Sequence, residues 1–394
     1  MAKNGGEGNI FDVIAKDHKK KFKSNTMQRL SEYNKEIPKL WYPTGIPTLD
    51  IALGGGFAGG RASEVFGAEG CGKSTTLYAV IAACQQKFPE GYHDFHIVAD
   101  PENSTSDSIE HMKLLGVDVE KVFIIAPEEG KPLYAEDIFE QIEELLRDPR
   151  LEGRIGIIGI DSLAALVSKF EGEKKDKWDK ASKVGGISPA MSMFIRNVVD
   201  NGLLYKSQGH LMMLNQVRDD MDSMWSEYRT PGGRKVRHTA AQRLDVKRTR
   251  GQDFKNSDYN HNDENANVAQ FIGQKIKFNQ VKSKVGGKDG ATASVAFYYG
   301  EGLDVLANSF AVAQRLGIIN KSGPWMTFID PPTGEVLCKQ QGENKFKQAL
   351  VEGDELYEKL DYLLSCGMRG IEPDSVVEEW GKIKAEESES DSND

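Results

Sequence analysis

An eight-residue stretch, Gly67 to Ser74, has the residue types and spacing of a loop that binds phosphate. It reads Gly67-Ala68-Glu69-Gly70-Cys71-Gly72-Lys73-Ser74 and is followed by Thr75. The glycines allow backbone N–H groups to converge on phosphate oxygens, and a helix that starts near Lys73 adds partial positive charge. We expect Lys73 to contact the β- and γ-phosphates of ATP and the Ser74 hydroxyl to ligate Mg²⁺. Cys71 is expected to be a small filler rather than a reactive thiol.

Two acidic positions follow apolar runs that are typical of buried strands. Asp161 ends the run Ile155 to Asp161, a place from which a carboxylate can hold Mg²⁺ through water. Glu102 follows the strand expected at Phe95 to Ala99, and we expect it to orient the water that attacks the γ-phosphate. Asp100 is the alternative for this role, and helix capping is the alternative function of Glu102 and Asp100. Asp161 could instead be an ordinary acid at the end of a strand. The acids together predict ATP hydrolysis.

Polar residues also follow two later apolar runs. Asn215 and Gln216 come after Leu211 to Leu214, where an amide could sense the γ-phosphate and signal to the next loop. An amide that only satisfies loop backbone groups is the equally compatible alternative. Lys282 and Lys284 alternate, so both face one side of a strand. Such lysines contact solvent or, in a multi-subunit ATPase, reach a neighbour's γ-phosphate as an arginine finger does.

Two loop-like stretches combine basic and aromatic side chains. The stretch from Arg218 to Ala240 has few apolar residues, and a long loop in a compact domain is usually functional or disordered. The stretch from Ser168 to Val184 also contains acids, so a solvated charged face is its alternative. Aromatic rings among cations suit contacts with DNA phosphates and bases. The expected DNA-binding residues are Phe170, Lys174, Lys175, Lys177, Lys183, Arg196, Arg218, Trp225, Arg229, Gly232, Gly233, Arg234, Lys235 and Arg237.

The composition is that of a globular chain and argues against several protein classes. The chain has 394 residues, 39% of them hydrophobic, and lacks an apolar run long enough to span a membrane. Its four cysteines form no CxxC pair, which argues against a zinc knuckle or disulfide framework and for a reducing, cytoplasmic compartment. The net charge is −10, but basic residues cluster between Arg229 and Arg250. The overall charge therefore does not exclude a nucleic-acid partner.

Strand-like and helix-like patterns alternate through the first half of the chain. The expected strands are Ala62 to Phe66, Phe95 to Ala99, Val122 to Ala126, Ile155 to Ile160 and Leu211 to Leu214. The expected helices include Lys73 to Gln85, Ser108 to Leu115 and Ala135 to Leu146. This alternation predicts an α/β fold with a mainly parallel twisted sheet. Three later runs lack long helices between them and are expected to be antiparallel additions: Leu244 to Val246, Lys275 to Val281 and Ala293 to Tyr299.

The chain is expected to contain four segments. Residues 1–38 form an N-terminal arm and linker, with a basic amphipathic helix at Ile10 to Phe22. Residues 39–303 form the ATPase and DNA-binding core, in which the polar stretch 256–267 is expected to be a surface loop. A small C-terminal α/β subdomain and an acidic disordered tail are expected at 304–380 and 381–394.

The order of these motifs resembles that of RecA-type strand-exchange recombinases over roughly residues 8–370. The segments that carry the resemblance are TGIPTLDIALGGGFAGGRASEVFGAEGCGKST, ADPEN, LGVDVEKVFIIAP, IIGIDSLAAL, LNQVR, PGG, QRLDVKR, VKSK and YYGEGLDVL. The resemblance implies a RecA-type P-loop ATPase core that uses ATP and Mg²⁺. It also implies a homo-oligomeric helical filament on single-stranded DNA that pairs with homologous double-stranded DNA in recombination and repair.

The resemblance also implies roles for single residues. Glu102 corresponds to the catalytic glutamate, and Gln216 to the residue that links the ATP state to the DNA loop. Lys282 and Lys284 correspond to the pair that reaches across the filament interface. The two implied DNA-binding loops are Phe170 to Val184 and Asp219 to Ala240. The implied arm that docks on the adjacent subunit consists of the N-terminal helix and a strand at Asn25 to Leu30.

Several positions depart from the family pattern. His111 stands where the family has an adenine-stacking tyrosine, which leaves the base contacts near Asp107 and His111 open. The second loop opens with the acids Asp219, Asp220 and Asp222, and the stretch 256–267 has no obvious counterpart. These departures suit a divergent, phage-encoded member. Two rival functions are a RecA-fold DNA helicase and an ATP-binding regulator that does not recombine DNA.

Overall fold

The structure, a computed structural model, describes residues 10–23, 27, 40–104, 108–129, 131–172, 186–219, 228–251, 254–255, 271–331, 333–353 and 355–369. The chain divides into two compact units, residues 1–40 and 41–394. In the first unit, α1 (Ile10–Phe22) confirms the expected helix and buries none of its residues. The implied arm strand at Asn25 to Leu30 lies outside the described residues except for Met27, and the acidic tail 381–394 lies wholly outside them.

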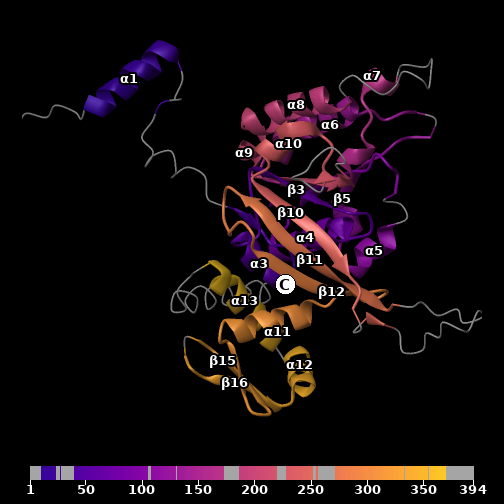
Figure 1. The fold of residues 1–394 in the computed structure, drawn as a ribbon. Coiled ribbons are helices and arrows are strands. Elements are labelled where there is room, and N and C mark those ends of the chain that lie inside the picture. Colours follow the sequence, from indigo (N-terminus) through magenta and orange to yellow (C-terminus); the bar gives the residue numbers. More distant parts are fainter. Residues whose placement is uncertain are drawn as a thin grey trace, which may run out of the picture. The chain divides into compact units, whose positions relative to one another are not determined.

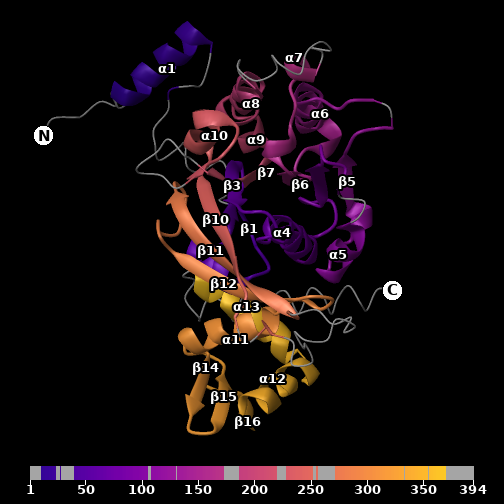
Figure 2. The ribbon, with the colours of Figure 1, turned by 45° about the vertical axis from the view of Figure 1, so that its right-hand side comes forward.

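Within the described part of the second unit, nine strands form one sheet in the order β13–β12–β11–β10–β3–β7–β6–β4–β5 (Figures 1 and 2). They are β3 (Arg61–Gly67), β4 (Phe95–Ala99), β5 (Val122–Ile125), β6 (Ile155–Ile160), β7 (His210–Gln216), β10 (Gln242–Thr249), β11 (Gly273–Ser283), β12 (Thr292–Tyr298) and β13 (Gly302–Leu303). The strands from β10 to β5 run parallel, and β11 to β13 add antiparallel pairs. The mainly parallel sheet is therefore confirmed.

One strand differs from its prediction. The run around Leu244 was expected to be an antiparallel addition, but β10 pairs parallel with β3 and antiparallel with β11. The connection from β7 contains α10 (Gly233–Thr239), which lies inside the stretch expected to be a loop. A parallel connection needs a crossover, usually helical, and this short helix contributes to it.

Helices cover both faces of the parallel strands. On one face α4 (Lys73–Lys87) packs on β6, where a Cβ at Gly159 would lie 2.6 Å from a methyl carbon of Leu77. On the other face α6 (Ala135–Arg147) and α8 (Ser188–Ile195) build an apolar cluster with β3, β4, β6 and β7. The rings of Phe139 and Phe194 stack there at 4.3 Å. The sheet is thus buried on both faces, as its continuous apolar strands require.

The C-terminal part of the second unit has an apolar core of its own. It contains α11 (Val305–Arg315), β14 (Ile319–Ser322), β15 (Trp325–Ile329), β16 (Val336–Gln341), α12 (Glu343–Glu352) and α13 (Leu356–Arg369). Phe310, Phe328 and Phe346 are buried in this core. This part contains both helices and the three-stranded sheet β14–β15–β16, and a separate subdomain at 304–380 stays a prediction. Among the helices that the structure describes, none is long and apolar enough to cross a membrane.

Candidate ATP site and nucleic-acid interface

The phosphate-binding stretch lies between a strand and a helix, as predicted. β3 ends at Gly67 and α4 begins at Lys73. Gly72 has a φ of 105°, a backbone conformation that side chains disfavour. A Cβ at Gly67 would lie 2.2 Å from the carbonyl oxygen of Val246. Glycine is therefore required at both positions for the loop to pass from β3 into α4.

The lysine of this loop lies over the loop itself. Lys73 Nζ donates hydrogen bonds to the carbonyl oxygens of Gly67, at 3.2 Å, and Ala68, at 2.8 Å. The side chain is buried, so its ammonium is held where the loop N–H groups are expected to receive phosphate. Burial also raises the pKa of the Cys71 thiol, which supports its expected role as a filler.

A hydroxyl and a carboxylate meet beside the loop. Ser74 Oγ donates to Asp161 Oδ2 at 2.6 Å, and the Asp161 backbone N–H donates to the carbonyl of Ala99. Burial raises the pKa of Asp161, the Ser74 bond opposes this, and the charges of Asp100 and Glu102 add to the rise. A cation would relieve the repulsion, and oxygen ligands of this kind are those Mg²⁺ prefers.

The two oxygen groups therefore fit Mg²⁺. Among the residues that the structure describes, no three His, Cys, Asp or Glu side chains are arranged to hold a metal ion. Mg²⁺ usually takes one or two carboxylates from the protein and completes its shell with phosphate and water.

The geometry separates the two candidates for the catalytic base. Glu102 is exposed, and its Oε1 accepts a hydrogen bond from Ser162 Oγ at 3.1 Å, next to Asp161. Asp100 is 1% exposed, and its Oδ1 accepts from Ser104 at 3.3 Å. A base must reach the attacking water. Glu102 is therefore the better placed carboxylate, while Asp100 is held in the protein interior.

His111 joins three elements around the start of α4. It lies on α5 (Ile109–Leu114), and its Nε2 is 3.1 Å from the hydroxyl of Thr75. Its ring meets those of Tyr78 and Phe297 edge-on at 6.0 and 5.5 Å. Burial lowers the pKa of His111, which favours the neutral ring. Asp107 lies outside the described residues, so contacts of both residues with adenine stay a prediction.

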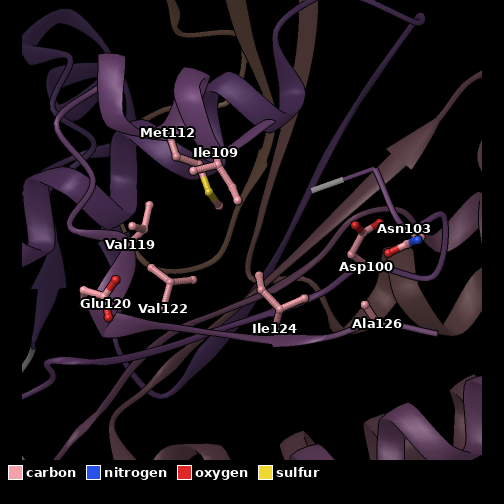
Figure 3. A pocket seen from close by; sticks show the side chains of 9 residues that line it. All are labelled: Asp100, Asn103, Ile109, Met112, Val119, Glu120, Val122, Ile124 and Ala126. Carbon is pink, nitrogen blue, oxygen red and sulfur yellow. The ribbon is translucent and has the colours of Figure 1, made fainter. Parts of the chain in front are cut away.

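A cavity of about 390 Å³ lies on another side of α5 (Figure 3). Ile109 and Met112 of α5 face Val122 and Ile124 of β5 across it, and Asp100 lies at one end. His111 does not line it. β5 is the last strand of the sheet order, and Ile124 is 44% exposed. The cavity is thus part of an apolar sheet edge and is separate from the side chain expected to contact adenine.

The end of β7 lies between the phosphate loop and the residues that precede α10. Gln216 lies opposite Gly67 in the parallel register of β3 and β7. Asn215 Nδ2 donates to Glu64 Oε1 and to the carbonyl of Pro231, both at 2.9 Å, and its Oδ1 accepts from the Gln216 N–H at 3.0 Å. Gln216 is therefore adjacent to the phosphate loop, and Asn215 links β3 to Pro231.

Lys282 and Lys284 bind the C-terminal end of α10. Lys282 Nζ donates to the carbonyls of Arg237, at 2.5 Å, and His238, at 3.1 Å. Lys284 Nζ donates to the His238 carbonyl at 2.6 Å. Cations at a helix C-terminus stabilise its free carbonyls. Desolvation, followed by the charges of Lys284 and Arg243, lowers the pKa of Lys282 to about 8.

The described DNA-binding candidates gather around α10 and the helices beside it. α10 begins after Gly232, whose φ is 88°, and Lys235 pairs with Asp200 at the end of η5 (Arg196–Asp200). Arg196 and Arg234 are exposed, and Arg237 Nε donates to Thr230 Oγ1 at 3.3 Å. Gly233 is also exposed and opens α10.

The other DNA-binding candidates are less fully described. Phe170 is 55% exposed in α7 (Lys169–Gly172), at the start of the first expected loop. Arg218 and Arg229 pair through their backbones as β8 (Arg218–Asp219) and β9 (Tyr228–Arg229), and their side chains are not described. The candidates outside the described residues are Lys174, Lys175, Lys177, Lys183 and Trp225, as is the stretch 256–267.

The sequence reasoning missed three residues of this region. Glu64 is 0% exposed in β3 and forms an ion pair with Arg243 at 2.6 Å, and Ser162 positions Glu102. The sequence feature that could have identified Glu64 is its position as an acid inside an apolar strand, three residues before Gly67. Its partners come from strands far away in sequence, so the signal did not identify them.

Comparison with known proteins shows the family of this chain. The family model described as RecA N-terminal domain matches residues 9–304. The Protein RecA of Aquifex aeolicus is 30% identical over 378 residues, covering 94% of this chain and 97% of that protein. The Protein RecA of Thermus aquaticus is 32% identical over 348 residues, covering 86% and 89%. The Protein RecA of Chlorobium limicola is 30% identical over 345 residues, covering 86% of each. The chain therefore belongs to the RecA family and is, at family level, a RecA-like recombinase.

Proposed function

We propose that the protein is a DNA-dependent ATPase that forms filaments on single-stranded DNA and catalyses pairing and strand exchange with homologous duplex. The observation that carries this is the contact of Ser74 with Asp161 beside Glu102, at the sheet edge where Asn215 reaches Pro231. A site for ATP hydrolysis and a basic segment thus share one edge of the sheet. Family membership over nearly the whole chain supports the same activity.

In this proposal the phosphate loop binds ATP, with Mg²⁺ held by Ser74 and Asp161. The ion would neutralise phosphate charge, and Glu102 would orient the attacking water. Gln216, which lies next to Gly67, would report the γ-phosphate to the following segment. His111 and Asp107 are the proposed contacts of the adenine base. Arg234, Arg237 and Arg196 would neutralise DNA phosphates, so binding should weaken steeply with salt.

Assembly would use two apolar surfaces of the described residues. α1 has exposed Ile10 and Val13, at 67% and 50%, and the apolar face of an amphipathic helix usually packs against another surface. β5 ends the sheet with Phe123 at 49% exposure. An edge strand is a template for pairing with another chain. We propose that the arm of a neighbouring copy, including Asn25 to Leu30, docks along β5, and that Lys282 and Lys284 reach the neighbour's γ-phosphate.

The deciding experiment is strand exchange between circular single-stranded DNA and its homologous linear duplex, with electron microscopy of the same samples. We expect joint molecules that require ATP and homology, and striated filaments on single-stranded DNA. Closed rings that unwind a forked duplex without homology would identify a helicase instead. ATP binding without DNA-stimulated hydrolysis would identify a regulator. Phe123→Asp should abolish filaments and leave ATP affinity within about twofold, because β5 does not contribute to the phosphate loop.

A further inference from the structure

Glu64 is a buried carboxylate at the centre of three strands. It lies in β3 and is 0% exposed. Its Oε1 accepts from Asn215 of β7 at 2.9 Å, and its Oε2 accepts from Arg243 Nε of β10 at 2.6 Å. Each oxygen therefore accepts a hydrogen bond from one of the two strands that flank β3. A buried carboxylate is costly unless it is paired and hydrogen-bonded, so this arrangement needs both partners.

The Asn215 side of this network leads to the start of the segment 231–239, which comprises Pro231, Gly232 and α10. The Asn215 amide has two N–H donors, and both are used, one by Glu64 and one by the Pro231 carbonyl. The hydrogen bond to Glu64 thus fixes one hydrogen of the amide while the other points to the Pro231 carbonyl. The start of the segment is thus one side chain away from the strand that ends in the phosphate loop.

The Arg243 side leads to the end of the same segment. The Arg243 guanidinium lies 4.7 Å from the ring centre of Phe66, and Arg243 pairs with Lys282 across β10 and β11. Lys282 holds the carbonyls of Arg237 and His238. Arg243 and Lys282 repel one another, and the charge of Glu64 opposes that repulsion by raising the pKa of Lys282. The strand pairing of Arg243 with Lys282 therefore places the ion pair of Glu64 next to the lysine that binds the end of α10.

We propose that Glu64 is a positioning residue that holds both ends of the segment 231–239 against the strand of the phosphate loop. Through Asn215 it places Pro231, and through Arg243 and Lys282 it places the C-terminal carbonyls of α10. Only the consequence for DNA rests on the function proposed above. If the segment contacts DNA, Glu64 determines how firmly its arginines are presented there, without touching ATP itself.

Glu64→Gln tests the proposal because it keeps the shape and removes the charge. In the wild type Asn215 and Arg243 bind different oxygens of the carboxylate, and the amide replaces one of these oxygens with an NH2 group. One of the two donors then faces another donor, so one of the two hydrogen bonds is lost. Hydrogen exchange read by mass spectrometry should show exchange at least tenfold faster in 233–240 and unchanged in α4. Affinity for a fluorescent ATP analogue should stay within about twofold. Affinity for labelled oligo-dT should fall about tenfold.

Two further variants control for general destabilisation. Asp50→Asn alters another buried acid, whose Oδ1 accepts from the Thr44 N–H, and should leave exchange in 233–240 unchanged. Asn215→Ser, which serves also if Glu64→Gln does not fold, should speed exchange at 233–235 and leave 237–240 unchanged. Unchanged exchange in 233–240 of both Glu64→Gln and Asn215→Ser would overturn the proposal. A third outcome is that the wild type fails to bind oligo-dT while the variants show faster exchange in 233–240. That result would support the positioning role of Glu64 and reject the proposed function.

Discussion

The carboxyl ends and the amino ends of the parallel strands differ in their polar side chains. At their carboxyl ends, β3, β4 and β6 present Lys73, Glu102 and Asp161, which are ionisable groups close to a hydroxyl and to each other. At their amino ends, His96 and His210 are 0% exposed. Ligands of open α/β sheets bind at the carboxyl ends of the strands. The candidate ATP site thus lies at the carboxyl edge, whereas the amino edge buries its histidines within the protein.

Burial favours the neutral form of the histidines at the amino ends. His210 Nδ1 is 2.8 Å from the Ala58 carbonyl, and its Nε2 is 2.8 Å from Ser63 Oγ, so the ring donates to one and accepts from the other. His93 Nδ1 is 2.8 Å from the Ile155 carbonyl. Burial lowers the pKa of His96 and of His210 to about 4. Changes at the carboxyl edge should therefore alter activity, whereas acid should act at the amino ends on stability.

The largest effect is expected from Lys73→Ala at the carboxyl edge. Loss of the ammonium that faces the phosphates should reduce ATP hydrolysis about 1,000-fold, since preorganised cations act on developing charge. Steady-state hydrolysis with and without single-stranded DNA measures this. Lys113→Ala removes an exposed lysine paired with Glu110 and should change hydrolysis less than twofold. Equal activity of the Lys73 variant and wild type would contradict an ATP site at this edge.

Glu102→Gln should reduce hydrolysis about 100-fold, the contribution typical of a general base. ATP affinity should stay within about threefold, because the amide keeps the size of the side chain and does not alter the phosphate loop. Asp100→Asn should instead lower the free energy of unfolding, because Asp100 is buried. Comparing hydrolysis with urea unfolding for both variants separates them. A greater loss of hydrolysis in a stable Asp100 variant would reverse the assignment of the base.

Acid should destabilise the protein through its amino-end histidines. A histidine whose folded-state pKa is about 4, against 6.5 when unfolded, binds a proton more readily in the unfolded chain. Its stabilising contribution is complete above pH 6.5 and is lost as the pH falls toward 4. Between pH 7.5 and pH 5 each of His96 and His210 should therefore remove about 2 kcal/mol from the free energy of unfolding.

Other groups change the free energy of unfolding in the opposite direction as the pH falls. The contribution of a histidine must therefore be measured with a variant that lacks it. Burial raises the pKa of Asp50 to about 7, and its contribution grows as the pH falls through that value. Urea unfolding of His96→Gln at both pH values should show a pH-dependent loss about 2 kcal/mol smaller than in wild type. His238→Gln, at an exposed position, should show the wild-type loss. An identical loss in wild type and His96→Gln would show that His96 does not titrate in this way.

The smallest effect concerns Lys282, whose charge is expected to be lost near pH 8. If the ammonium acts on a neighbour's phosphate, DNA-dependent hydrolysis should fall up to tenfold between pH 7 and pH 9. Lys282→Arg should abolish this decline, because a guanidinium stays charged. Lys288→Arg changes an exposed lysine of the same hairpin and should keep the decline. A pH profile that is the same with arginine at 282 would remove Lys282 from the hydrolysis step.

The sequence by itself determined the features that depend on neighbours along the chain. The stretch Gly67 to Ser74 predicted a strand–loop–helix, and β4 and β6 begin and end where their apolar runs do. Alternating strands and helices predicted the mainly parallel sheet. Local spacing is sufficient here because the periods of strands and helices and the glycine requirement are properties of short segments.

Only the tertiary structure decided which distant residues meet. The parallel pairing of β10 with β3, the helical form of α10 and the link from Glu64 to Arg243, 179 residues apart, have no local signal. The same holds for the burial of His210 against Ser63. Strand order and side-chain partners depend on the packing of the whole sheet, whose contacts join residues far apart in the chain.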